Sequence, residues 1–149
     1  MKLSIIIPVY NEKDTIEKII KKVEKVPIEK EIIIVDDGSN DGTQDILKKF
    51  KNKKDIKVIL KEKNEGKGAA IRKGIKYVTG NVLVIQDADL EYEPNNFLKM
   101  LEVMKENDAN VVYGSRILGK GKKSSFLFYL GGRFLSFLAN ILYNAKITD

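Results

Sequence analysis

Three carboxylates at alternate positions, Asp87, Asp89 and Glu91, directly follow the mainly apolar segment 81–86. An apolar, β-branched run of this length predicts a buried strand, and open α/β sheets bind ligands at the carboxyl ends of their strands. Carboxylates this close repel one another unless a cation lies among them, and hard divalent metals prefer oxygen ligands. The spacing therefore predicts a metal site that serves a phosphorylated substrate.

The absence of two residue types narrows the chemistry of such a site. The 149-residue chain has no cysteine and no histidine. It therefore has no thiolate nucleophile or thiolate metal ligand, and it lacks the commonest general base. Any reaction must use carboxylates, lysine, arginine, tyrosine or backbone groups.

The net charge is +6 and comes mostly from lysine, with arginine only at Arg72, Arg116 and Arg133. This charge favours anionic ligands or an anionic membrane surface, and a solvated lysine-rich surface is the alternative. Basic and acidic residues are interspersed without a recognition motif, so we expect no nucleic-acid partner. Met1 and Lys2 lead directly into a strand pattern with no secretory signal, and we expect a cytoplasmic protein at the cytoplasmic membrane face.

The elements that would position the carboxylates alternate between strand-like and helical patterns. Strand-like apolar runs lie at 3–10, 31–35, 56–60, 81–86 and 110–114. Between them, apolar residues at helical spacing predict four helices. Their members are Ile16, Ile19, Ile20 and Val23; Ile46, Leu47 and Phe50; Ala69, Ala70, Ile71, Ile75 and Val78; and Phe97, Leu98, Leu101 and Met104. This alternation predicts a three-layer α/β fold with a mostly parallel central sheet, in one domain over 1–149.

The sequence changes character beyond Arg116. Segment 119–125 is basic and predicts a loop, whereas 126–144 has apolar residues at helical spacing. Arg133 and the pair Gly131 and Gly132 interrupt this apolar run, which disfavours a transmembrane helix. Two interpretations of 126–144 stay open: a core helix, or an amphipathic helix lying in a membrane interface.

Three predicted strand ends carry polar residues that would meet at one edge of a parallel sheet. They are the segments 8–12, 35–39 and 87–91, and each alone is a weak signal. Together they resemble family 2 glycosyltransferases of the GT-A fold, a Rossmann-like architecture. Within that family the chain is similar to the polyprenyl-phosphate glycosyltransferases, typified by dolichol-phosphate mannose synthase. Further matching segments are 64–70, 114–116 and 133–140.

The resemblance implies roles for the matched residues. A pocket for the base and ribose would contain Pro8, Tyr10, Glu12, Val35 and Asp37, although Asp37 also suits an Asx-turn. The nucleotide diphosphate would lie at Asp87, Ala88 and Asp89, and Mg²⁺ or Mn²⁺ would be held by Asp87, Asp89 and Glu91. Many relatives have glutamine at the position of Glu91.

Arg116 and Arg133 would recognise phosphate groups and, with Asp89, make up the catalytic residues that the resemblance implies. A surface salt bridge is the alternative for each arginine. The loop 64–68 lacks the phosphate-loop and dinucleotide signatures. Its small residues indicate either packing of the following helix against the sheet or a contact of Lys67 with a diphosphate.

The reaction that the resemblance implies is inverting transfer of a sugar from GDP-mannose or a UDP-hexose to a polyprenyl phosphate. The acceptor phosphate is already anionic near neutral pH, so this reaction needs no general base and is compatible with a chain without histidine. Peripheral membrane contact is expected for such an acceptor.

Two alternatives accompany this interpretation. The first is a soluble family 2 enzyme that acts on a sugar hydroxyl, or a donor-binding fragment with little transfer activity. The fragment is considered because the chain ends at Asp149, where relatives continue. An aspartyl phosphatase is the other, because Asp-x-Asp after a strand also suits a phosphoaspartate nucleophile, but it leaves the other two strand ends unexplained.

Overall fold

A computed structural model describes residues 1–114 and 126–143 of the chain. They form nine elements: β1 (Leu3–Val9), α1 (Ile16–Lys25), β2 (Lys30–Asp36), α2 (Thr43–Lys48), β3 (Ile56–Leu60), α3 (Lys67–Ile75), β4 (Val82–Ile85), α4 (Asn96–Glu106) and α5 (Phe126–Tyr143). The chain divides into two compact units, 1–98 and 99–149. The prediction of one domain over 1–149 stays a prediction.

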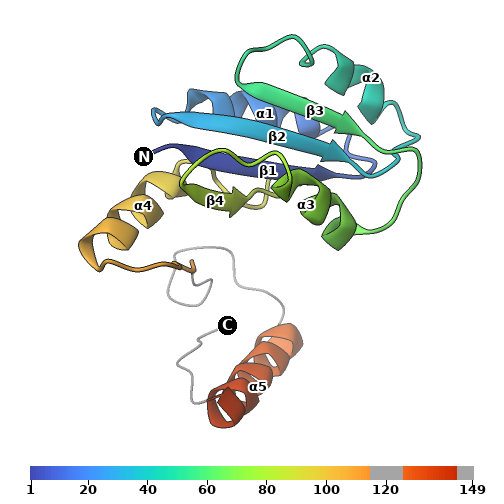
Figure 1. Cartoon of the computed structure of the whole chain (residues 1–149). Helices are drawn as coiled ribbons and strands as arrows, with labels where there is room; N and C mark the ends of the chain where they lie inside the picture. The colour runs from blue at the N-terminus through green and yellow to red at the C-terminus, as the bar shows by residue number, and fades with distance from the viewer. Residues whose placement is uncertain (115–125, 144–149) are drawn as a thin grey trace. The chain divides into compact units, whose positions relative to one another are not determined.

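The first unit is built on a four-stranded sheet in the order β3-β2-β1-β4, and every neighbouring pair is parallel. All four strands therefore end at the same edge of the sheet (Figure 1). Figure 1 shows α1 behind the sheet and α3 in front of it. The predicted three-layer α/β fold is confirmed, and among the described residues the sheet is entirely parallel.

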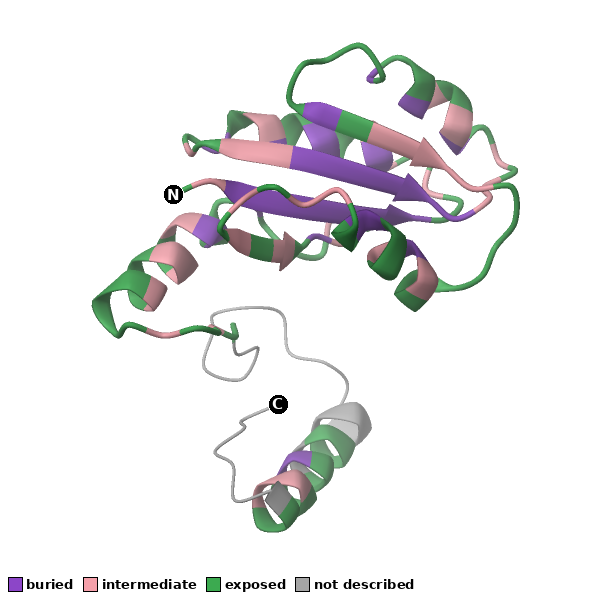
Figure 2. Cartoon of the chain, viewed as in Figure 1, coloured by how far each residue is buried: buried purple, intermediate pink, exposed green. Residues whose placement is uncertain are grey.

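Helices on both faces bury the two central strands. All seven residues of β1 are buried, as are the last five of β2 (Figure 2). Successive side chains of a strand point to opposite faces, so Ile6, Ile33 and Val35 share one face, where Ala70 of α3 packs against them. The opposite face is left to the apolar side of α1, whose Ile19 and other apolar residues are fully buried.

Two expectations about the strands were wrong. We predicted a buried strand at 81–86, but among residues 1–114 and 126–143 β4 is an edge strand, and Leu83 and Ile85 are 41% and 45% exposed. We also predicted a strand at 110–114, and the structure has no strand there; Val111 and Tyr113 are exposed. Apolar, β-branched residues favour an extended backbone. A strand forms, however, only where a neighbouring strand supplies hydrogen bonds, and its burial depends on what covers it.

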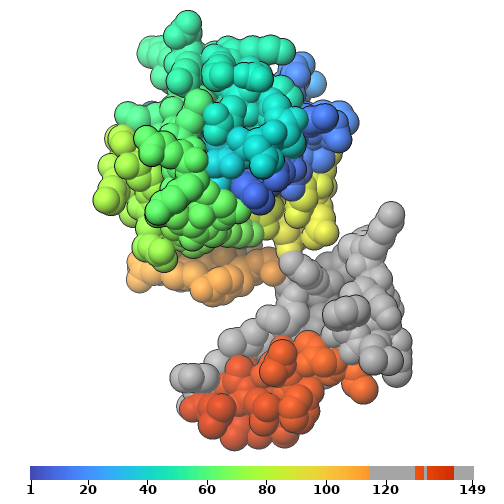
Figure 3. Space-filling view, turned by 90° about the vertical axis from the view of Figure 1, so that its right-hand side faces the viewer, coloured from blue at the N-terminus to red at the C-terminus, as the bar shows by residue number. Residues whose placement is uncertain are grey.

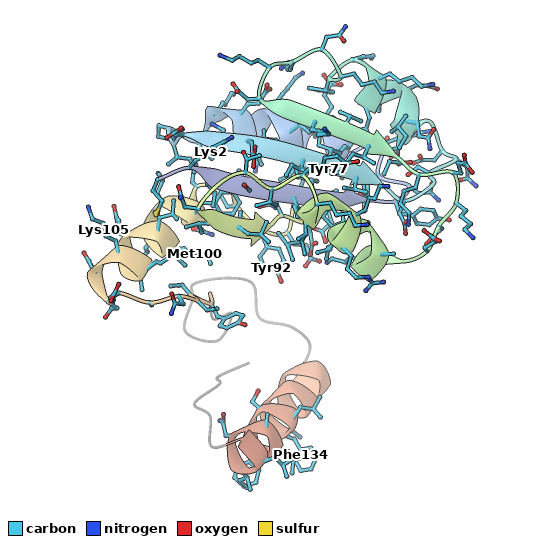
Figure 4. All side chains as sticks on the ribbon, viewed as in Figure 1. Lys2, Tyr77, Tyr92, Met100, Lys105 and Phe134 are labelled. Atoms are coloured by element: carbon cyan, nitrogen blue, oxygen red, sulfur yellow. The ribbon has the colours of Figure 1, made fainter. Side chains whose placement is uncertain are left out.

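The second unit contains most of α4 and all of α5. Phe97, at the start of α4, is buried, and the other residues of its predicted apolar face are half-buried. Helix α5 confirms the predicted helical segment, and several large apolar side chains project from it into solvent, among them Phe134 (Figure 4). Of the helices within 1–114 and 126–143, none is long and apolar enough to cross a membrane.

Candidate functional site

The segments that follow the strands meet at the carboxyl edge of the sheet. Figure 3 looks onto this edge and shows the blue, cyan, green and yellow segments beside one another. A pocket of about 290 Å³ opens there and draws its walls from the ends of β1, β2 and β4 and from the start of α3. It is lined by Pro8, Val9, Tyr10, Glu12, Asp37, Asn64, Gly66, Lys67, Ala70, Asp87, Ala88 and Asp89.

A second, larger hollow of about 510 Å³ lies at the opposite end of the strands, around Lys30 and Ile56. It contains none of the predicted site residues. Ligands of parallel α/β sheets bind at the carboxyl edge, so the smaller pocket is the candidate site.

Asp87 and Asp89 both line the pocket, directly after β4. The ammonium nitrogen of Lys67, the first residue of α3, lies 2.5 Å from Oδ1 of Asp87. The carboxylate of Asp89 accepts the backbone N–H of Glu91 at 3.0 Å, across a turn in which Leu90 has a φ of 64°. The turn fixes the backbone at Asp89, while Asp87 already holds one cationic group.

The donor set fits a metal that is shared with a phosphorylated ligand. Within 1–114 and 126–143 no three carboxylates gather closely enough to hold a metal alone. Mg²⁺ and similar ions are commonly bound by one or two carboxylates together with substrate phosphates, and Asp87 and Asp89 supply that number. Glu91 does not line the pocket, and its metal contact stays a prediction.

Asp37 occupies the pocket wall contributed by the end of β2. Its side chain is almost fully buried and accepts hydrogen bonds from the Lys61 ammonium and from the backbone N–H of Glu65 at 3.2 Å. Burial raises the pKa of Asp37, but the Lys61 ammonium and the Glu65 N–H outweigh it, so this pKa lies below its usual value. The Asp37 and Glu65 carboxylates in turn raise the pKa of Lys61.

This arrangement makes Asp37 a charged hydrogen-bond acceptor near neutral pH. Lys61 and the Glu65 N–H orient it, and a carboxylate has about four lone-pair sites, so the group retains capacity to accept an N–H from a ligand. A nucleobase that presents an N–H would suit it.

The loop after β1 is tied to the loop after β2. The backbone N–H of Asn11 donates to Ser39 Oγ, and that of Glu12 donates to Thr43 Oγ1, both at 2.9 Å. These bonds hold Tyr10 and Glu12 at the pocket wall, where Tyr10 is 44% exposed. An aromatic ring exposed beside a pocket can pack against a planar ligand.

The pocket wall formed by the loop after β3 and the start of α3 depends on two glycines. Gly66 precedes α3 with a φ of 89°, a conformation that glycine adopts at low cost, and this helix start has no side-chain cap. Gly38, with a φ of 78°, lies so close to the loop after β3 that an added Cβ would be 2.6 Å from the Lys63 carbonyl carbon. Close contact of these loops places Asn64 in the pocket, and an uncapped helix N-terminus suits an anion.

The structure brings together most of the predicted site residues. Those that line the pocket are Pro8, Tyr10, Glu12, Asp37, Asp87, Ala88 and Asp89. Val35 does not line it: this residue is fully buried and packs with Ala70, which itself lines the pocket. A residue of a central strand with helices on both faces is covered by them, and the role of Val35 in the base pocket stays a prediction.

The two predicted arginines are not placed in the site. Arg116 lies outside the described residues. Arg133 belongs to α5, in the second unit, and its side chain is outside the described part of the chain. Their roles stay predictions.

Sequence reasoning missed Lys61, the ion-pair partner of Asp37, and the close approach of Gly38 to Lys63. A signal for Lys61 exists, because it directly follows β3 and therefore lies at the same sheet edge as the other strand ends. The contact at Gly38 depends on how two loops pack, and no local pattern predicts it.

A parallel α/β sheet with carboxylates and a lysine around a pocket at its carboxyl edge is typical of proteins that bind phosphorylated ligands. Residues 4–145 match the family described as glycosyl transferase family 2, and the chain belongs to this family.

Relatives of known sequence and structure agree with this assignment. A dolichol-phosphate mannosyltransferase of Pyrococcus furiosus is 35% identical over 131 residues, which are 87% of this chain and 37% of that protein. A crystal structure of S. aureus TarS 1–349 in complex with UDP has 27% identity and a TM-score of 0.66, and the match covers 84% of this chain and 39% of that one. Both relatives are thus much longer than the part that the chain matches.

A more distant structure shares the GT-A fold. It is the mannosyltransferase PcManGT from Pyrobaculum calidifontis in complex with GDP-Man and Mn²⁺, with 24% identity and a TM-score of 0.58. The match covers 64% of this chain and 30% of that one.

Proposed function

We propose that the chain binds a nucleotide sugar, GDP-mannose or a UDP-hexose, and supports inverting transfer of the sugar to a polyprenyl phosphate. One observation carries the proposal: a single pocket combines a charged acceptor, Asp37, with two carboxylates, Asp87 and Asp89. Asp37 suits a nucleobase that presents an N–H, and the two carboxylates suit a metal that is shared with a diphosphate. The relation to a dolichol-phosphate mannosyltransferase supports the acceptor class.

The donor would lie across the sheet edge, with its base at Asp37 and Tyr10 and its diphosphate at Asp87 and Asp89. When bound there, Mg²⁺ or Mn²⁺ supplies positive charge that stabilises the nucleoside diphosphate as it leaves. The crystal structure of TarS 1–349 was obtained in complex with UDP, and this supports a nucleotide as the ligand of the chain.

The reaction is a single displacement at the anomeric carbon. An oxygen of the acceptor phosphate forms a bond to this carbon, the bond from the carbon to the diphosphate oxygen breaks, and the configuration inverts. The attacking oxygen is already anionic, so no side chain has to remove a proton. Arg116 and Arg133 are proposed to position the anionic groups.

We propose that the reaction takes place at the cytoplasmic membrane face. In α5, Leu130, Phe134, Leu135, Phe137, Ile141 and Leu142 are all at least 59% exposed. An exposed apolar helix surface of this kind suits a membrane interface, and the net charge of +6 favours an anionic one. Flotation of the full chain with vesicles that contain anionic lipid tests this contact; a chain that stays unbound contradicts it.

Transfer itself is tested with labelled GDP-mannose and UDP-hexoses, a polyprenyl phosphate and Mn²⁺. We expect a labelled lipid product from one nucleotide class, and its loss in Asp89→Ala. Unchanged transfer in that variant would contradict the metal role. Product formed only with sugar-hydroxyl acceptors would favour the soluble alternative. Binding of the nucleotide sugar without any product would favour a donor-binding fragment.

A further inference from the structure

The ion pair between Lys67 and Asp87 connects two walls of the pocket. Lys67 begins α3 and Asp87 follows β4, and their side chains meet at 2.5 Å. The Lys67 side chain is 58% exposed, whereas that of Asp87 is 27% exposed. The pair therefore lies at the rim of the pocket, and the lysine is its more exposed member.

The Asp87 carboxylate has two competing uses. Its Oδ1 accepts the Lys67 ammonium, and the same carboxylate is proposed as a metal ligand. A divalent ion and an ammonium on one carboxylate would bring two positive charges within a few ångströms, where they repel. Lys67 would therefore weaken the hold of Asp87 on a metal for as long as it stays paired there.

A displaced Lys67 has a second anionic partner available once the donor binds. A nucleoside diphosphate carries roughly three negative charges near neutral pH, and one divalent ion with two aspartates leaves that charge uncompensated. Lys67 lines the pocket at a helix start without a side-chain cap, and both the ammonium and the helix N-terminus favour phosphate.

The flanking residues permit this change of partner. Gly66, directly before Lys67, has open space around the position of a Cβ, and Gly68 follows it with only the end of the Arg72 side chain at 3.4 Å. The ammonium can move to the diphosphate by side-chain rotation, without repacking of the sheet.

We propose that Lys67 exchanges partners during donor binding: it pairs with Asp87, yields this carboxylate to the metal, and then binds the donor diphosphate. This inference rests on the proposed function. It makes Lys67 a residue that opposes binding of the metal alone but favours binding of metal and nucleotide together.

The test compares Lys67→Met with the wild type and with Lys73→Met. Lys73 is an exposed lysine on the same helix that does not line the pocket, so its replacement removes an equal charge. Binding of Mn²⁺ alone is measured by electron paramagnetic resonance, and binding of GDP and UDP at saturating Mn²⁺ by calorimetry. Circular dichroism confirms that each variant is folded.

Opposite changes are expected in Lys67→Met. Mn²⁺ alone should bind about twofold to fivefold more tightly, because a partly exposed competing ion pair has gone. The nucleotide should bind about tenfold to a hundredfold more weakly, because a charge-assisted phosphate contact has gone. Lys73→Met should change neither affinity by more than about twofold.

Changes in the same direction, or no change in either affinity, would overturn the exchange of partners while leaving the proposed function intact. If the wild type shows no Mn²⁺-dependent binding of GDP or UDP, the proposed function and the role of Lys67 both fail.

Discussion

Replacement of Gly38 by alanine should disrupt the pocket through the backbone alone. Gly38 has a φ of 78°, and an added Cβ would lie 2.6 Å from the carbonyl carbon of Lys63 and 2.8 Å from the backbone nitrogen of Asn64. These are backbone atoms, so no side-chain rotation relieves the overlap. Either the loop after β3 or the loop after β2 must move by about 0.8 Å to restore ordinary contact.

Two effects add in Gly38→Ala. The left-handed backbone costs an L-residue about 1–2 kcal/mol, and the forced overlap costs about 1–3 kcal/mol more. We therefore expect the free energy of unfolding to fall by about 2–5 kcal/mol. The shift also moves Asn64 and the Glu65 N–H that orients Asp37, so nucleotide affinity should fall even at temperatures where the variant is fully folded.

Gly42→Ala is the matched control. Gly42 has a φ of 100°, but its added Cβ would meet nothing within 4 Å, so only the backbone cost of about 1–2 kcal/mol applies. Urea unfolding measures both variants, and calorimetry measures their binding of GDP and UDP with Mn²⁺. If Gly38→Ala is no less stable than Gly42→Ala, the close approach of the two loops is refuted.

The other predictions concern Glu31, which stabilises the fold, and Asp37, which lines the pocket. Burial raises the pKa of Glu31, but hydrogen bonds from Ser4, Thr79 and Lys2 outweigh it and hold this pKa at about 2. Because the folded pKa is depressed, the stabilisation is present above the unfolded value and is lost as the pH falls toward 2. Glu31→Gln should therefore unfold about 1–3 kcal/mol more easily at pH 7 and lose less stability than the wild type between pH 5 and 3 in urea titrations; equal losses would contradict this. Asp37→Asn should lower nucleotide affinity about tenfold and stability by about 1–3 kcal/mol, because the half-buried Lys61 loses one of its charged partners. Asp45→Asn, which removes an exposed partner of Lys48, should leave stability nearly unchanged, and similar effects of both changes would contradict the role of Asp37.

The sequence predicted what depends on local pattern and chain order. Alternating apolar runs and helical faces specify a parallel sheet, and a parallel sheet brings the segments after its strands to one edge. That is why Tyr10, Asp37 and Asp87, far apart in the chain, could be predicted to line one pocket, as they do.

Features that depend on tertiary packing could not be predicted in this way. The apolar composition of β4 is that of a central strand, although β4 lies at the edge of the sheet. Val35 belongs to a matched motif but is covered by the core, and the ion pairs of Lys61 and Lys67 depend on which side chains meet across loops. Each of these requires knowledge of neighbours that no short segment contains.

Binding of a nucleotide with and without metal tests the central claim most directly. Calorimetric titration of the full chain with GDP and with UDP, each with Mn²⁺ and with chelator, measures whether the carboxyl-edge pocket holds a metal-bound diphosphate. We predict binding of at least one nucleotide that requires Mn²⁺ and is lost in Asp89→Ala. Binding that is equally strong without metal, or that survives in Asp89→Ala, would contradict the account.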